Sequence, residues 1–150
     1  MYRIEKVTLT KDIMKRIIEL SEMWVKEGIS TGIVKNTKND FVGKDIYVAY
    51  NKKNEIVAYL LSSSFTEKRQ GITIPKKAKV CYIDEIYVMK YYRNKGIGTD
   101  LYNALYNDVK GKCDFIELST STKDTKRILN FYVNKLKMNF WSAMFYTKIS

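Results

Sequence analysis

"YRNKGIGTDL" (residues 92–101) follows the apolar run "CYIDEIYVM" (residues 81–89) and opens a segment with helical periodicity. The first N–H groups of a helix have no internal partners, and the helix dipole adds positive potential there, so an anion is stabilised at that point. Gly96 and Gly98 remove side chains that would hold a phosphate away, and Arg93 and Lys95 add charge-assisted hydrogen bonds. These residues predict a pyrophosphate site.

Two common glycine loops do not fit this stretch. A dinucleotide-binding fingerprint needs a third glycine where the chain has Leu101, and it normally opens the first βαβ unit. A P-loop needs a terminal GK[ST], which is missing. What remains is R-x-x-G-x-G, from Arg93 to Gly98.

The composition is that of a folded globular protein. The 150 residues, of which 45% are hydrophobic, predict one domain over residues 1–150. No run of 18 apolar residues and no signal peptide is evident, so we expect a cytoplasmic protein with no membrane partner. Cys81 and Cys113 lie in apolar runs and are expected to be core thiols, with no disulfide and no metal site.

The sequence contains no histidine. This absence excludes a histidine general base, a Ser-His-Asp or Cys-His arrangement and every histidine-ligated metal site. Any chemistry must therefore use carboxylates, tyrosines, lysines, water or backbone groups.

The net charge is +11, from 27 basic and 16 acidic residues. Such a surplus attracts nucleic acid, an acidic membrane or a phosphorylated cofactor, or it reflects a solvated lysine-rich surface. The basic residues are scattered and form no known nucleic-acid-binding motif, although the long loop at residues 65–79 is locally basic. Nucleic acid is therefore the less favoured partner.

The pattern of apolar and turn residues predicts a mixed α+β chain. Thr10 is the expected N-cap of a first helix that ends at Gly28, and a short helix can lie within residues 30–44. Further helices are expected over residues 97–109 and 123–136, and strands over residues 2–8, 45–50, 55–64, 80–88, 114–120 and 140–149. The order mixes hairpins with a crossover, so the sheet should be mixed and mostly antiparallel.

The stretch "IYVMKYYRNKGIGTDLYNAL" resembles the acetyl-CoA-binding motif of the GNAT family, the GCN5-related N-acetyltransferases. "TKRILNFYVNKL" (residues 125–136) is similar to the next motif of that family, and the order of elements fits along nearly the whole chain. The resemblance implies a GNAT fold with a six- to seven-stranded sheet and about four helices. It also implies acetyl-CoA as acetyl donor.

In that family the cofactor lies in a V between two splayed strands, here residues 80–88 and 114–120. The resemblance implies that the backbone of Ile86, Tyr87 and Val88 pairs with the pantetheine arm. It places the pyrophosphate on Arg93, Asn94, Lys95, Gly96, Ile97, Gly98 and Thr99. Thr125 is a further expected contact, although family members often carry asparagine there.

Tyr132 matches the position of the family's general acid, which protonates the departing thiolate. A phenol with an ordinary pKa of about 10 is a reasonable donor. The alternative is that Tyr132 is a core aromatic, in a chain with 12 tyrosines.

Asp84 and Glu85 are the nearest candidates to deprotonate and orient an amine. In an unbroken strand they point to opposite faces, so one at most faces the cleft unless a bulge intervenes. The stretch "YIDEIYVMKYYRNKGIG" resembles diamine and polyamine acetyltransferases, which carry an acidic pair here. Equally, one carboxylate can face solvent or pair with a neighbouring lysine. Many members of the family carry a phenylalanine soon after the tyrosine, whereas here the next phenylalanine is Phe140. This difference predicts a differently shaped wall of the acceptor site.

The leading hypothesis is acetyl transfer to a primary amine by direct attack in a ternary complex, with a small cationic amine or polyamine favoured. Aminoglycosides, amino acids, protein lysines and N-termini stay open as acceptors. A ping-pong route through Cys81 is disfavoured, because a thiol in an apolar strand stays protonated. Two other classes remain, a basic nucleic-acid-binding module and a non-catalytic CoA-binding protein, and a homodimer is left open.

Overall fold

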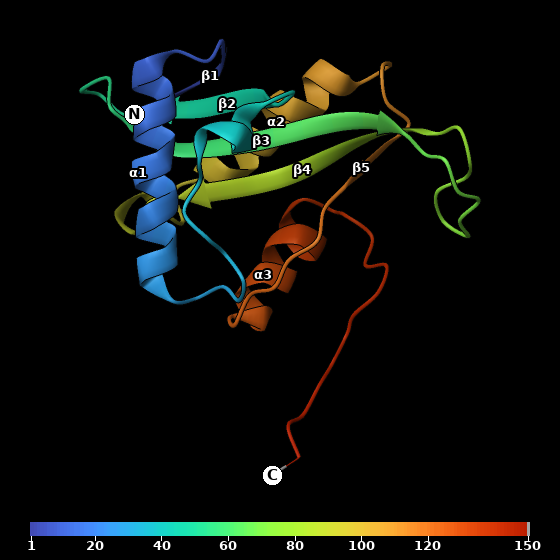
Figure 1. Ribbon diagram of the computed structural model, residues 1–150. Coiled ribbons are helices and arrows are strands. Elements are labelled where there is room, and N and C mark those ends of the chain that lie inside the picture. The colour runs from blue at the N-terminus through green and yellow to red at the C-terminus, as the bar shows by residue number, and fades with distance from the viewer. Residues whose placement is uncertain (150) are drawn as a thin grey trace.

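The computed structural model describes residues 1–149 as helices packed on a five-stranded sheet of order β1-β2-β3-β4-β5 (Figure 1). The first three pairings are antiparallel and β4 pairs with β5 in parallel, which confirms a mixed, mostly antiparallel sheet. The strands are β1 (Arg3–Val7), β2 (Asp45–Tyr50), β3 (Ile56–Thr66), β4 (Lys79–Val88) and β5 (Phe115–Glu117). The six or seven strands that the resemblance implied are therefore corrected to five.

Three α-helices form, where about four were expected: α1 (Lys11–Glu27), α2 (Ile97–Val109) and α3 (Thr125–Leu129). The hydroxyl of Thr10 accepts the Ile13 N–H and Gly28 ends α1 with a φ of 64°, as the sequence predicts. Short 3₁₀ turns, η1 (Lys38–Phe41) and η2 (Lys90–Tyr92), complete the connections. Within residues 1–149, no helix is both long and apolar enough to cross a bilayer.

The sheet lies between two hydrophobic cores because successive side chains along its strands point to opposite faces. Ile17 and Leu20 of α1 pack on one face, against residues such as Val48. Leu101 and Leu105 of α2 pack on the other face. The alternation of apolar side chains along β2 and β3 thus fixes which helix covers which side.

The end of the chain differs from the expectation. Residues 140–149 were predicted to be a strand, but they pair with no strand and are exposed along their whole length. The segment leaves the body beyond η3 (Asn130–Lys135), a π-helical continuation of α3 (Figure 1). The helix predicted over residues 123–136 thus changes its hydrogen-bond pattern at Asn130, where i→i+5 bonding begins.

Strand β5 is also shorter than predicted, and it ends at Glu117 instead of residue 120. Beyond it the chain crosses to the loop after α1, where the Thr31 N–H donates to the Ser121 carbonyl and Ser30 forms an isolated bridge with Thr122. These bonds replace a continued ladder with β4.

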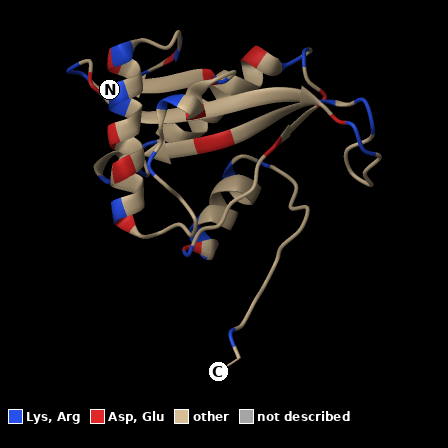
Figure 2. Ribbon diagram, in the orientation of Figure 1, with Lys and Arg blue, Asp and Glu red and all other residues tan. Residues whose placement is uncertain are grey.

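The predicted basic loop joins β3 to β4 at the end of the sheet far from α1. Figure 2 shows this loop extending from the body, with the positions of its lysines and arginines in blue. Ile72 in this loop is fully exposed. The loop lines no part of the cavity described below.

Asp108 of α2 connects that helix to the first two strands. It accepts hydrogen bonds from the buried Tyr47 hydroxyl and the Lys6 ammonium, each at 2.6 Å. The bonds from Lys6 and Tyr47 lower the pKa of Asp108 well below its usual range.

We expect Asp108→Ala to reduce the free energy of unfolding by about 1–3 kcal/mol, because the buried Tyr47 hydroxyl loses its acceptor. A depressed folded-state pKa stabilises the fold above the unfolded pKa of about 3.9, and that contribution is lost as the pH falls. The difference between wild type and variant should therefore narrow from about pH 7 to about pH 3 in urea unfolding. Asp45→Ala, which removes a half-exposed partner of Lys6, is the control and should cost less than about 1 kcal/mol. Equal losses for both variants would contradict the assignment.

Candidate active site

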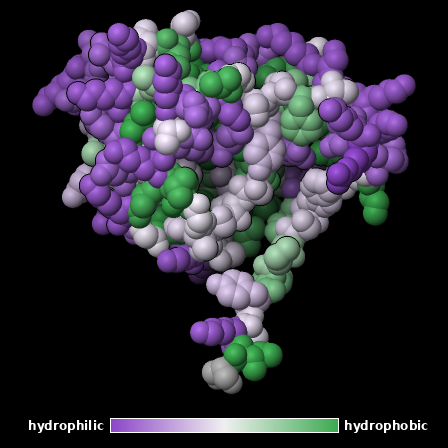
Figure 3. All heavy atoms as spheres, viewed as in Figure 1, coloured by the Kyte–Doolittle hydropathy of each residue, from purple (hydrophilic) through white to green (hydrophobic). Residues whose placement is uncertain are grey.

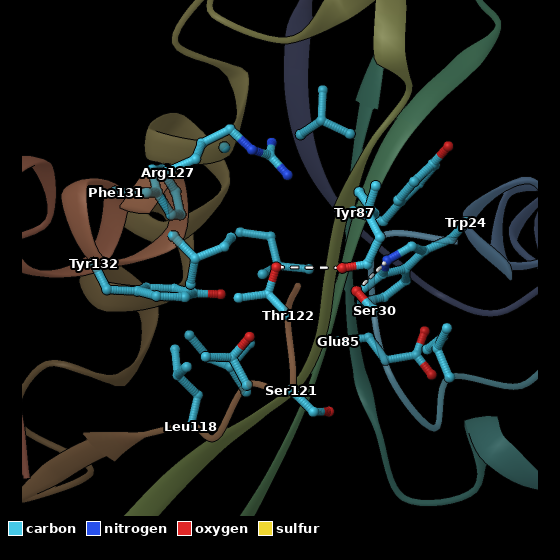
Figure 4. Close-up of a pocket in the computed structure, with 18 of the residues that line it drawn as sticks. Trp24, Ser30, Glu85, Tyr87, Leu118, Ser121, Thr122, Arg127, Phe131 and Tyr132 are labelled. Atoms are coloured by element: carbon cyan, nitrogen blue, oxygen red, sulfur yellow. Dashed lines mark hydrogen bonds between the residues drawn. The ribbon is translucent and has the colours of Figure 1, made fainter. Parts of the chain in front are cut away.

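A cavity of about 530 Å³ lies beside β4, between the loop after α1 and the helical segment α3–η3 (Figure 4). Its walls come from four parts of the chain that are far apart in sequence: residues 24–40, 82–99, 118–122 and 127–135. The cavity therefore exists only in the folded chain.

The cavity opens where β4 and β5 separate. Their ladder ends at the pair Tyr82 and Glu117, and one further contact joins the Tyr82 hydroxyl to the Ser119 hydroxyl at 2.8 Å. Beyond this point none of the residues that the structure describes forms a strand partner for β4 on that side, while its other edge stays paired with β3. The predicted residues Ile86, Tyr87 and Val88 lie on this separated part of β4 and line the cavity.

The glycine turn forms a second wall of the cavity. Asn94 and Gly96 have φ angles of 61° and 86°, and Gly96 is the N-cap of α2 with no side-chain cap. Left-handed residues alternating with right-handed ones direct successive N–H groups into one concavity. Within residues 1–149, the N–H groups of Ile97, Gly98 and Thr99 donate to no carbonyl or side chain. The arrangement suits an anion.

Gly98 has a packing role that the sequence did not reveal. A Cβ at this position would lie 3.1 Å from Cζ of Phe131 and 3.9 Å from Val88. The missing side chain therefore lets η3 approach the start of α2. This contact brings Tyr132, the next residue after Phe131, to the cavity wall.

Arg93 lines the cavity, but its guanidinium is directed at protein groups. Nη2 contacts the Glu27 carboxylate at 2.7 Å, and Nε donates to the Val88 carbonyl at 2.8 Å. The same Glu27 carboxylate accepts the Tyr87 hydroxyl at 2.7 Å. Arg93 thus fastens the glycine turn to α1 and to the end of β4. Sequence reasoning missed Glu27, because nothing near it in sequence indicates a partner 66 residues away.

Two other predicted cofactor residues lie outside the cavity lining. The Lys95 ammonium lies over the Tyr92 ring, 5.3 Å from its centroid, and Thr125 is exposed at the start of α3. Asn94, Gly96, Ile97, Gly98 and Thr99 do line it. Arg127 and Lys135 also line it, and they were not predicted, although they lie in the second motif.

A β-bulge brings both acidic residues of β4 to one face. Leu61 pairs with Glu85 and Ser62 pairs with Ile83, so Asp84 is an extra residue without a partner. Glu85 contacts Tyr59, which packs in the core on the α1 side of the sheet. Asp84 contacts Ser63, which lies on the same face of β3 as Tyr59 because side chains alternate along a strand. The strand is therefore not unbroken, and this bulge is the exception under which both carboxylates can face the cleft.

Glu85 is partly buried and accepts hydrogen bonds from two neutral donors. The Tyr59 hydroxyl donates to Oε2 at 2.6 Å and the Asn36 amide donates to the same atom at 3.0 Å. Burial raises the pKa of Glu85, although these two hydrogen bonds act in the opposite direction. Burial also raises the pKa of Tyr59 well above its usual value, so this phenol stays a donor.

Asp84 is partly neutralised by a lysine. Its carboxylate accepts the Lys44 ammonium at 2.6 Å and the Ser63 hydroxyl at 3.0 Å. The pairing with a lysine was one of the alternatives drawn from the sequence. Asp84 and Glu85 both line the cavity. They differ because Asp84 is paired with the Lys44 ammonium, whereas Glu85 accepts hydrogen bonds from neutral donors.

Tyr132 lies on η3 with its ring directed into the cavity (Figure 4). Burial raises the pKa of Tyr132 to about 12, so its hydroxyl is protonated at neutral pH. Within residues 1–149 this hydroxyl has no hydrogen-bond partner. The Phe131 ring lies beside the Tyr132 ring at a centroid distance of 5.1 Å and is tilted by 59° to it.

Comparison with solved structures gives the same fold over nearly the full chain. An aminoglycoside acetyltransferase from an uncultured soil metagenomic sample, solved with trehalose, is 16% identical, with coverage of 99% of this chain and 97% of that chain and a TM-score of 0.69. A tetramutant of the BH1408 protein of Bacillus halodurans is 19% identical, with coverage of 98% of this chain and 99% of that chain and a TM-score of 0.71. An acetyltransferase of Trypanosoma brucei is 18% identical, with coverage of 98% and 100% and a TM-score of 0.68.

A match to a family profile shows the family of this sequence. No curated protein matches the sequence. The profile described as "Acetyltransferase (GNAT) family" matches residues 14–138, which include the glycine turn, the bulged strand and Tyr132. The chain therefore belongs to the GNAT family of N-acetyltransferases, which use acetyl-CoA as acetyl donor.

Proposed function

We propose that this enzyme acetylates a primary amine of a small cationic molecule, with a polyamine favoured, by direct attack in a ternary complex. The observation that carries the proposal is the bulge at Asp84, since it presents two adjacent carboxylates to one cavity. A cationic acceptor is favoured there because each carboxylate attracts an ammonium group.

The donor end of the cavity is assigned to the glycine turn. The unpartnered N–H groups of Ile97, Gly98 and Thr99 fit a pyrophosphate, and the free edge at Ile86–Val88 fits an extended amide chain. When bound, acetyl-CoA supplies the acetyl group as a thioester. The side chains of Arg127 and Lys135 add positive charge to this wall.

Charge is distributed unevenly around the cavity. Figure 4 shows Arg127 on the opposite side of the cavity from Glu85. Among the described residues, the carboxylates of the lining are Asp40 on η1 and Asp84 and Glu85 on β4. An anionic donor and a cationic acceptor would thus be attracted to different ends, which supports simultaneous binding of both.

Glu85 is the proposed base. A lysine-like amine has a pKa of about 10.4 and must lose a proton before it can attack. Because burial raises the pKa of Glu85, this carboxylate accepts a proton more readily than an exposed glutamate does. Asp84, already paired with Lys44, is proposed to bind and orient the second ammonium of a longer acceptor.

Tyr132 is the proposed acid. Its phenol is protonated at neutral pH and lies in the cavity without a partner among the described residues, so its proton is available to a sulfur leaving group. The π-helical turn supports this role, since such turns recur at functional sites.

The acceptor is tested by measuring thiol release from acetyl-CoA against a panel of amines. Putrescine, spermidine and spermine stand for the favoured class. An aminoglycoside is the second arm, because one structural relative is named an aminoglycoside acetyltransferase and was also solved with sisomicin. A lysine peptide and DNA complete the panel. Turnover with the peptide alone, or DNA binding without acetyl-CoA binding, would overturn the proposal.

For Tyr132→Phe we expect kcat to fall about 100-fold or more, the usual contribution of a positioned acid. Coenzyme A affinity, measured by calorimetry, should change little because the hydroxyl has no structural partner in residues 1–149. Tyr91→Phe, a change at an exposed tyrosine, is the matched control. Unchanged turnover in Tyr132→Phe would remove this residue from the acid role.

For Glu85→Gln we expect kcat/KM for the amine to fall about 100-fold or more, with loss of the acidic limb of its pH profile. The sign follows from the raised pKa: wild type loses activity as the pH falls and Glu85 takes up a proton. Asp84→Asn is the comparison and should mainly raise KM for acceptors with two or more ammonium groups. If both variants keep wild-type rates and KM values for every amine, the carboxylate assignment fails.

For Glu27→Gln we expect the dissociation constant of coenzyme A to rise about 10-fold, equivalent to about 1.4 kcal/mol. The carboxylate fastens Arg93 and Tyr87, so its loss should loosen the glycine turn without touching the reacting atoms. The value of kcat at saturating acetyl-CoA should stay close to that of wild type. Glu22→Gln, on the same helix but paired only with exposed lysines, is the control. Equal effects at both positions would contradict a positioning role for Glu27.

A further inference from the structure

The loop that joins β3 to β4, residues 65–79, is a basic hairpin that takes no part in the cavity. Lys68 and Arg69 precede an uncharged apex, and Lys76 and Lys77 follow it. All four side chains are exposed, and within residues 1–149 none of them forms an ion pair. Two free cations therefore flank the apex on each arm of the hairpin.

The shape of the basic hairpin is fixed by backbone bonds and a small core. Beyond the last ladder pair of β3 and β4, the Glu67 N–H donates to the Ala78 carbonyl and the Lys77 N–H donates to the Glu67 carbonyl, both at 2.8 Å. Ile74 is buried and belongs to a small core with Ala78. A Cβ at Gly71 would lie 2.7 Å from the Ile74 carbonyl oxygen, so the turn at the apex needs glycine. The cations are thus held on a preformed scaffold.

The acidic groups near the basic hairpin lie at its base. The Glu67 carboxylate accepts the Arg69 N–H at 2.9 Å, and the Asp114 carboxylate accepts the Lys79 N–H at 2.8 Å. Residues 68–79 contain no acidic side chain. Figure 3 shows hydrophilic atoms over most of the surface where the hairpin projects, at the right of the view. The arms and the apex therefore carry positive potential.

Four unpaired cations on two adjacent arms suit a partner with closely spaced negative charges. Duplex DNA has one phosphate per about 1.7 Å of helix axis. Its major groove is about 12 Å wide and admits a two-stranded β-ribbon. The two arms of a hairpin lie about 4.8 Å apart, so lysine and arginine side chains have room to reach phosphates on both sides of the groove.

Other anionic partners fit the basic hairpin less well. A membrane surface holds a peripheral protein through buried apolar area as well as charge, and Ile72 is the one large exposed apolar side chain within residues 66–79. Single-stranded nucleic acid is bound by stacking of bases on aromatic rings, and residues 66–79 contain none. Duplex RNA has a deep and narrow major groove. Duplex DNA is therefore the partner that these residues favour.

We propose that the basic hairpin binds the phosphate backbone of duplex DNA without sequence specificity, at a surface separate from the acetyl-transfer cavity. The basic residues of the whole chain are scattered, whereas the fold presents these four together. Contacts to phosphate give affinity and carry no sequence information. Because the hairpin lines no part of the cavity, DNA and coenzyme A bind at the same time. The proposal does not depend on which amine is acetylated.

The proposal is tested with the full-length protein by fluorescence anisotropy of a labelled DNA duplex of mixed sequence, between about 50 and 200 mM salt. Each phosphate contact contributes about −0.9 to the slope of the logarithm of the binding constant against the logarithm of salt concentration, so four contacts predict a slope of about −3.6. Lys68→Gln combined with Lys76→Gln removes one cation from each arm. We expect the slope to become about −1.8 and the dissociation constant at about 50 mM salt to rise at least 10-fold.

The matched control is Lys52→Gln combined with Lys53→Gln, at two exposed lysines in the turn at the other end of β3. This control should change the dissociation constant of DNA less than about 2-fold, because the length of β3 separates the turn from the hairpin by more than a Debye length of about 10–15 Å. Both double variants should keep the wild-type affinity for coenzyme A, which reports that the body is folded. Saturating coenzyme A should leave DNA binding unchanged.

Several outcomes would overturn the proposal. Equal losses of DNA affinity in the two double variants would mean that DNA responds to net charge alone. Displacement of DNA by coenzyme A would place the DNA at the glycine turn. Tighter binding to single-stranded DNA or duplex RNA, or hairpin-dependent binding to phosphatidylserine vesicles without binding to duplex DNA, would assign the hairpin to another partner. Absence of DNA binding at about 50 mM salt, where phosphate contacts are strong, would refute it directly.

Discussion

The separation of β4 from β5 is the constraint on which the rest of the site depends. The parallel ladder lasts for three residues, and the chain beyond β5 then bonds to the loop after α1. A continued ladder would satisfy the backbone of β4 and close the cavity. Because the ladder ends at Tyr82, the remaining half of β4 keeps one free edge facing the start of α2. The bulge at Asp84 begins just beyond this point.

The two ends of the cavity have electrostatic potentials of opposite sign, and most of the charged side chains there are paired with other groups of the protein. At one end, neutral N–H groups and a helix dipole provide positive potential, while Arg93 is already paired with Glu27. At the other end, Glu85 is held by neutral donors and Asp84 by Lys44. Pairing keeps each charged group in place, and burial raises the pKa of Glu85.

Local chemistry made the glycine turn predictable, because glycine conformation and helix-end N–H groups are properties of adjacent residues. The directions in which the Arg93 and Lys95 side chains point were not predictable, because they depend on contacts with Glu27 and Tyr92 that form only in the folded chain. The same applies to Gly98, which was assigned to ligand access alone and also admits Phe131. Thr125 was placed at the cofactor from its motif, yet it lies outside the cavity lining.

The sequence by itself determined the alternation of helices and strands, the two core faces of the sheet, the glycine turn and the family. Each of these follows from periodicity or from a contiguous motif. Tertiary structure decided that Asp84 and Glu85 share a face, because a bulge depends on the register with β3. It also decided that residues 140–149 form no strand within their own chain, because a strand needs a partner that local sequence cannot supply.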